Sequence, residues 1–171
     1  MRKKILIMLV AILFLTGCDG KKRKRYDPYK YNPMEQTITK GFDISFEKEN
    51  GVRTIMVNAN GVLGITAIFD SGCSTMLISQ LELRQLIKHG TISESDISVG
   101  YFTIADGETM QLPQVRLQVS LVDSKGEEHV TSVDAAVVED LSASALVGNA
   151  VFGNLANKIT IDDSKNIIHF E

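Results

Sequence analysis

The chain has 171 residues, a length that fits one domain of ordinary size. Hydrophobic residues make up 44% of it and charged residues 23%, which is near the average of globular proteins and excludes disorder throughout. Ten of the eighteen Lys and Arg lie in residues 1–40, whereas residues 41–171 hold eighteen of the twenty-one Asp and Glu. The second part therefore carries a net charge of about −10, which argues against a polyanionic partner.

Residues 1–17 have the pattern of a secretory signal peptide. The basic residues Arg2–Lys4 precede an apolar run from Ile5 to Leu15 that is too short to span a bilayer comfortably. The quartet that ends at Cys18, Leu-Thr-Gly-Cys, resembles the lipobox of bacterial lipoproteins, in which the cysteine is diacylated and becomes the new N-terminus. Two acyl chains anchor a protein stably, so we expect a membrane-bound protein. An ordinary signal peptide or an uncleaved anchor is the alternative.

Residues 18–38 are predicted to be a tether between the anchor and a folded domain at 39–171. Lys21–Arg25 are five consecutive basic residues, suited to anionic lipid headgroups, and no apolar periodicity follows them. A nucleic-acid patch is disfavoured, because a lipid anchor outside the cytoplasm keeps the run away from nucleic acid. Asp19 resembles the inner-membrane retention signal of some Gram-negative lipoproteins, so in a Gram-negative bacterium the periplasmic face of that membrane is favoured.

Period-two alternation of apolar residues predicts that the domain is mainly β. Phe42, Ile44 and Phe46 alternate with polar residues, and so do the odd-numbered apolar residues from Val115 to Leu121. Further strands are predicted at 52–58, 61–69, 99–105, 129–138, 158–162 and 166–170. Many short strands with few helices indicate a small closed barrel or a sandwich.

One helix is clear, and a second is suggested. Ser79 can cap a helix in which Leu83, Leu86 and Ile87 share a face before Gly90 ends it. A shorter helical turn is predicted from Asn149 to Leu155.

The segment whose side chains could carry out catalysis follows the apolar run Ile65–Phe69. It reads Asp70-Ser71-Gly72-Cys73-Ser74. An ionisable side chain at the tip of a buried strand is costly unless it is paired or solvated. The three residues Asp, Ser and Gly are also common turn formers, so a plain turn is the alternative explanation.

Phe69–Ser79, which reads FDSGCSTMLIS, resembles the active-site loop and exit strand of the retropepsin-like (clan AA) aspartic peptidases. Three later segments match further elements of that family in the same order. They are Ile104–Glu108 for its flap, Leu146-Val147-Gly148 with Phe152 for the apolar-apolar-Gly element under the loop, and Lys158–Asp162 with Ile167–Phe170 for its closing strand pair. Ser71, Cys73 and Val147 depart from the commoner Thr, Ala and Leu. The resemblance covers residues 40–171 and implies a single acid-protease-type lobe, a small closed barrel with one short helix or two.

The resemblance implies an aspartic endopeptidase with Asp70, Ser71 and Gly72 as catalytic-loop residues, no cofactor and no metal. Two neighbouring carboxylates share one proton, and their two pKa values split apart. The ionised carboxylate takes a proton from a water while its protonated partner donates to the scissile carbonyl. The chain has no second Asp-Thr/Ser-Gly, so the other carboxylate must come from a second copy, in a two-fold homodimer.

A polypeptide substrate is expected to lie extended beneath a flap at about residues 101–112, with Ala105, Asp106 and Gly107 as its substrate-binding residues. Tyr101, Phe102 and Met110 line substrate pockets or pack within strands, and packing is the favoured interpretation for each.

Two other chemistries and one other class of protein compete with this prediction. Cys73 is left without an intrachain partner once Cys18 is lipidated, but no histidine has a recognisable spacing to it for a thiol mechanism. His89, His129 and His169 are far apart in the sequence and form no metal-ligand motif. The main alternative is a non-catalytic lipoprotein that keeps the fold to bind peptides or to assemble.

Overall fold

The computed structural model describes residues 41–103, 108–141 and 143–171. Strands dominate these residues, and two α-helices and one short 3-10 helix accompany them, as expected for a mainly β domain. In chain order the elements are β1 Phe42–Ser45, β2 Glu47–Glu49, β3 Val52–Ala59, β4 Leu63–Phe69, β5 Met76–Ser79, α1 Gln80–Lys88, the 3-10 helix Glu94–Asp96, β6 Ile97–Thr103, β7 Thr109–Val122, β8 Glu128–Val138, β9 Ala145–Val147, α2 Asn149–Leu155, β10 Ile159–Asp162 and β11 Ile167–Phe170. No helix in the described ranges has both the length and the apolar character needed to cross a membrane.

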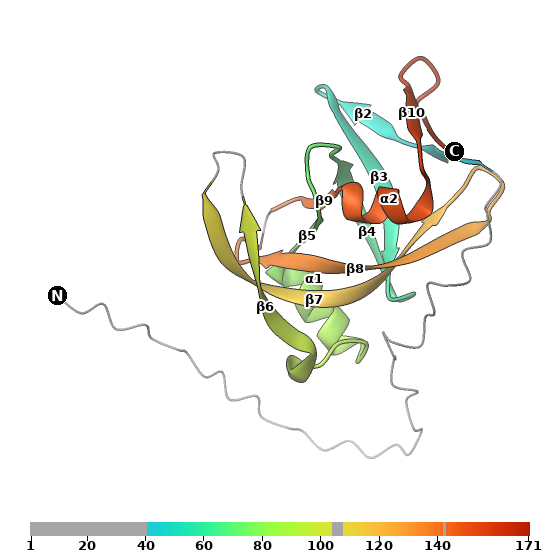
Figure 1. Ribbon diagram of the computed structural model, residues 1–171. Coiled ribbons are helices and arrows are strands. Elements are labelled where there is room, and N and C mark those ends of the chain that lie inside the picture. Colours follow the sequence, from blue (N-terminus) through green and yellow to red (C-terminus); the bar gives the residue numbers. More distant parts are fainter. Residues whose placement is uncertain (1–40, 104–107, 142) are drawn as a thin grey trace, which may run out of the picture.

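The strands form two sheets (Figure 1). The smaller sheet has the order β1-β11-β10, and the larger one has the order β2-β3-β4-β9-β5-β8-β7-β6. Strand β3 also pairs with β7, at Asn58 with Ser120 and Ala59 with Val119. Six strands therefore form a ring of pairings, in the order β3, β4, β9, β5, β8, β7 and back to β3. This ring is compatible with the predicted closed barrel, which stays a prediction.

The core follows the alternation read from the sequence. Along β7, Val115, Leu117, Val119 and Leu121 are at most 1% exposed. Full burial of such a side chain stabilises the fold by about 1.5–3 kcal/mol. The neighbouring strand β8 buries three consecutive residues, Ala135 to Val137, because both of its faces are covered there.

Helix α1 begins with the predicted cap. The Ser79 hydroxyl accepts a hydrogen bond from the Glu82 backbone N–H, and the Glu82 carboxylate accepts one from the Ser79 backbone N–H at 2.6 Å. Leu83 and Leu86 are buried, and Gly90 follows the helix with a φ of +71°. The expected bounds of this helix are confirmed.

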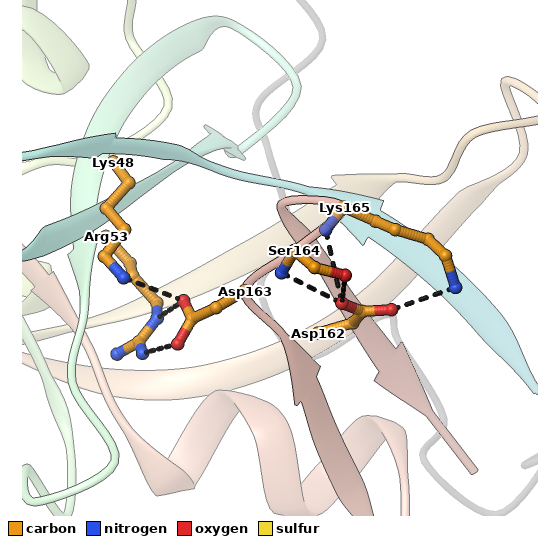
Figure 2. A network of polar contacts seen from close by, with 6 residues as sticks. All are labelled: Lys48, Arg53, Asp162, Asp163, Ser164 and Lys165. Atoms are coloured by element: carbon orange, nitrogen blue, oxygen red, sulfur yellow. Dashed lines mark hydrogen bonds and ion pairs between the residues drawn. The ribbon is translucent and has the colours of Figure 1, made fainter.

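The β2–β3 hairpin joins the larger sheet to the smaller one through ion pairs (Figure 2). Asn50 and Gly51 both have positive φ, as a tight hairpin turn requires. Arg53 of β3 donates two hydrogen bonds to the Asp163 carboxylate, at 2.9 and 2.7 Å, and Lys48 of β2 donates a third at 3.2 Å. Asp163 lies in the β10–β11 turn, so one carboxylate connects both hairpins.

The Arg53 guanidinium, with a smaller contribution from Lys48, holds the pKa of Asp163 at about 2, below its ordinary value of 3.8. A lowered pKa stabilises the fold above the ordinary value, and this stabilisation is lost as the pH falls through the folded value. Asp163→Asn should therefore lower the urea midpoint at pH 7. The difference from wild type should shrink between about pH 4 and pH 2. A difference that stays constant over this range would show that the ionised carboxylate is not responsible.

Candidate active site

The loop from Asp70 to Thr75 connects β4 to β5, and β9 lies between these two strands (Figure 1). Strand β9 runs parallel to β4, with Val147 opposite Phe69, and antiparallel to β5, with Val147 opposite Met76. The segment Leu146-Val147-Gly148 therefore supports the loop at its base, as the sequence resemblance implies. The closing strand pair, β10 with β11, is also present.

Asp70 is half-buried at the end of β4, and both its backbone and its side chain are held. Its backbone N–H donates to the Val147 carbonyl at 3.1 Å, and its own carbonyl accepts from the Cys73 N–H at 3.2 Å. The side-chain atom Oδ1 accepts a hydrogen bond from the Gly72 backbone N–H at 2.8 Å. The carboxylate is thus oriented by its own loop.

Ser71 and Gly72 are exposed in the single chain. A Cβ placed on Gly72 would lie 3.2 Å from Asp70 Oδ1, which is tighter than most contacts of that kind. Glycine at this position therefore allows its backbone N–H to approach the carboxylate closely.

The first residues of α2 donate hydrogen bonds to the loop, and these contacts were not predicted from the sequence. The backbone N–H groups of Asn149 and Ala150 donate to the carbonyls of Cys73 and Ser74, at 2.8 and 3.1 Å. The Asn149 side chain donates to the Ser71 carbonyl at 2.8 Å. A Cβ on Gly148 would lie 2.3 Å from the carbonyl oxygens of Cys73 and Thr75. The sequence resemblance already assigned Gly148 to the element under the loop, but nothing in the sequence connected Asn149 to the loop.

Strands β6 and β7 pair as far as Thr103 and Thr109, in the region predicted to form a flap. The predicted substrate-binding residues Ala105, Asp106 and Gly107 lie outside the described residues. Strand packing was the favoured interpretation for Tyr101, Phe102 and Met110. The structure corrects it for two of them: Tyr101 is 75% exposed and Met110 is 42% exposed, because this part of the hairpin extends beyond the core. Phe102 is half-buried.

Cys73 has a half-buried thiol that donates to the Thr75 carbonyl at 3.3 Å. Two of the three histidines contact aspartates elsewhere in the fold: His129 contacts Asp123 at 3.2 Å, and His169 contacts Asp43 at 2.7 Å. These contacts give no support to a thiol mechanism.

Asp123, Glu127 and His129 form one group whose potential metal-ligand atoms all lie within 4.8 Å. The Asp123 carboxylate accepts hydrogen bonds from the backbone N–H groups of Lys125 and Glu127, at 2.8 Å each. Burial raises the pKa of Asp123, but these bonds and the His129 ring outweigh burial, so its pKa lies below the ordinary value. The hydrogen bonds by which Asp123 closes the β7–β8 turn account for the closeness of these three side chains.

The predicted lipidation residue Cys18, the signal peptide and the tether up to residue 38 lie outside the described ranges.

Among solved structures, the chain is similar to a retropepsin-like aspartic protease from Rickettsia conorii. The TM-score is 0.51 and the sequence identity 16%, over 77% of this chain and 90% of that chain. No family model and no curated protein matches the sequence.

The comparison defines the fold as retropepsin-like, and at this identity it shows the fold alone. The residues Asp70, Ser71 and Gly72 of this chain occupy a loop between two strands of that fold, braced by β9 and α2.

Proposed function

We propose that the chain is an aspartic endopeptidase that acts as a homodimer. The observation that carries the proposal is the half-buried Asp70 at the end of β4, with its Oδ1 bonded to the Gly72 N–H, in a retropepsin-like fold. Each chain has one Asp-Ser-Gly loop and so one candidate catalytic carboxylate, whereas the mechanism needs two. Each chain therefore contributes one Asp70 to the dimer axis.

In the proposed reaction, the ionised Asp70 accepts a proton from a water whose oxygen attacks the scissile carbonyl carbon. The protonated Asp70 of the second copy donates its proton to the carbonyl oxygen. As the C–N bond breaks, the leaving nitrogen takes a proton from the carboxyl that received one from water. One hydroxyl of the tetrahedral intermediate gives its proton back to the Asp70 carboxylate of the second copy, and the C=O bond of the new carboxyl group forms. Water is consumed, and both carboxyl groups recover their starting states.

The proposed substrate is a polypeptide in an extended conformation beneath the β6–β7 hairpin. Val99 and Tyr101 lie opposite Pro113 and Gln111, so they share a face of the hairpin. Further along β7, the same face carries the buried Val115. We assign Tyr101 to a substrate pocket on the basis of this face and its exposure.

The proposed location is the bacterial cell envelope, with the domain anchored through diacylated Cys18. In a Gram-negative bacterium the periplasmic face of the inner membrane is favoured. Anchoring in one membrane raises the effective concentration of dimer partners. The proposed partners are the peptide, a second copy and the membrane.

The test uses the protein expressed from the whole sequence and purified in detergent. It is incubated with an unfolded protein between pH 3 and pH 7, and digestion of the unfolded protein is measured. We expect new fragments in the mass spectrum, formed faster at acidic pH. A peptide analogue with a secondary hydroxyl in place of the scissile bond resembles the tetrahedral transition state, so it should inhibit the formation of these fragments. The intact mass of the same preparation should exceed that of a chain beginning at Cys18 by the mass of the attached lipid. Peptide binding without any fragment would favour the non-catalytic alternative.

A further inference from the structure

The peptide unit between Ser71 and Gly72 is hydrogen-bonded at both ends. Its carbonyl oxygen, on Ser71, accepts from Asn149 Nδ2 at 2.8 Å. Its N–H, on Gly72, donates to Asp70 Oδ1 at 2.8 Å. A peptide unit is planar and rigid, so fixing the oxygen also fixes the direction of the N–H.

Asn149 makes this contact from an exposed position. It is the first residue of α2, and its own backbone N–H is bonded to Cys73. The buried residues of the helix are Val151 and Phe152, so packing of α2 does not depend on the Asn149 side chain. Within the described residues, its side-chain amide donates one hydrogen bond, to the loop that carries Asp70.

We propose that Asn149 is a positioning residue for Asp70, an inference that rests on the proposed peptidase function. The chain of contacts runs from the Asn149 amide through the Ser71–Gly72 peptide to the Asp70 carboxylate. Hydrogen bonds in series polarise one another, so the Asn149 bond makes the Gly72 N–H a stronger donor. A stronger donor favours the ionised carboxylate, the form that takes the proton from water.

Removal of the donor should slow the chemical step and leave substrate binding nearly unchanged. We expect Asn149→Ala to lower kcat by about 2- to 10-fold, the effect of one hydrogen bond, with KM within about twofold. The acidic limb of the rate profile should move to higher pH, because the ionised form is less favoured. Asn157→Ala is the matched control. Asn157 is exposed just after α2, and its backbone N–H donates to the Glu171 carbonyl, a bond that alanine keeps.

Asn149→Asp separates positioning from a merely structural role. When ionised, the new carboxylate faces the Ser71 carbonyl as a second acceptor, so the loss of kcat should exceed that of Asn149→Ala. When protonated, below about pH 4, it can donate again. The ratio of variant to wild-type activity should therefore rise as the pH falls. A ratio that does not change with pH, or kcat and pH profiles equal to those of Asn157→Ala, would overturn the catalytic part of the proposal.

A second readout does not depend on activity. Ser71-Gly72 is the one Ser-Gly pair in the sequence, so labelling serine with carbonyl ¹³C and glycine with ¹⁵N marks this peptide alone in the full-length protein. We expect the carbonyl and amide resonances to move in Asn149→Ala and to stay in Asn157→Ala. Unchanged resonances in Asn149→Ala would overturn the positioning itself. If the wild type cleaves nothing, the proposed function fails, and these resonances still decide whether Asn149 orients the peptide.

Discussion

Asparagine in place of Asp70 is expected to lower peptide cleavage by on the order of 10²- to 10⁴-fold, the contribution of positioned acid–base catalysis. The amide has the shape of the carboxylate and can still accept the Gly72 N–H, which lies 2.8 Å from Oδ1 in the wild type. It cannot take a proton from water. Thermal unfolding and the mass of the assembly should therefore stay near the wild-type values while cleavage is lost. Asp134→Asn is a suitable control, because Asp134 is an exposed acid paired with Arg116.

Mixing Asp70→Asn with the wild type tests whether two chains share one site. In an equal mixture of exchanging subunits, about a quarter of the dimers carry two aspartates, because the pairing of identical surfaces is random. Cleavage should then fall to about a quarter of that of the same total amount of wild type. A fall to about half would mean that each chain acts alone, and the paired-carboxylate mechanism would be wrong.

Most of the fold could be predicted because burial leaves a pattern in the sequence. Strand β7 was predicted from the alternation between Gln114 and Leu121, where each inward residue is packed in the core. Its first part, from Thr109 to Pro113, projects beyond the core, so no alternation marks it. Strand β2 was missed for the same reason, since its three residues are all exposed and are held by pairing with β3.

The candidate site could be predicted only in part. Asp70-Ser71-Gly72 at the tip of an apolar strand, with Leu146-Val147-Gly148 later in the chain, was enough to predict a braced loop. The bond from Asn149 to the Ser71 carbonyl spans 78 residues of sequence and is made by an exposed polar side chain. Such a contact has no periodicity or burial pattern, so it emerges only when the chain is folded. The single chain likewise leaves the pairing of two Asp70 residues as a proposal.

Alanine in place of Gly148 is expected to be the most destabilising small substitution around the loop. The added Cβ would lie 2.3 Å from the carbonyl oxygens of Cys73 and Thr75 and 2.8 Å from the Cys73 carbonyl carbon. These are backbone atoms of the loop, which cannot rotate away as a flexible side chain can. We expect a loss of about 3 kcal/mol in the free energy of unfolding, the upper end of overpacking. Displacement of the loop should also abolish cleavage, because Asp70 moves with it.

Gly153→Ala is the matched control for this substitution. Gly153 lies in α2, five residues after Gly148, and a Cβ there would meet no atom within 4 Å. Alanine at an exposed helical position is neutral or stabilises by up to about 1 kcal/mol relative to glycine. Urea unfolding of both variants measures the difference, and digestion of an unfolded protein measures the effect on the loop. If Gly148→Ala keeps both its urea midpoint and its cleavage rate near those of Gly153→Ala, the loop is not tightly seated on the end of β9. The bracing that orients Asp70 would then have to come from elsewhere in the fold.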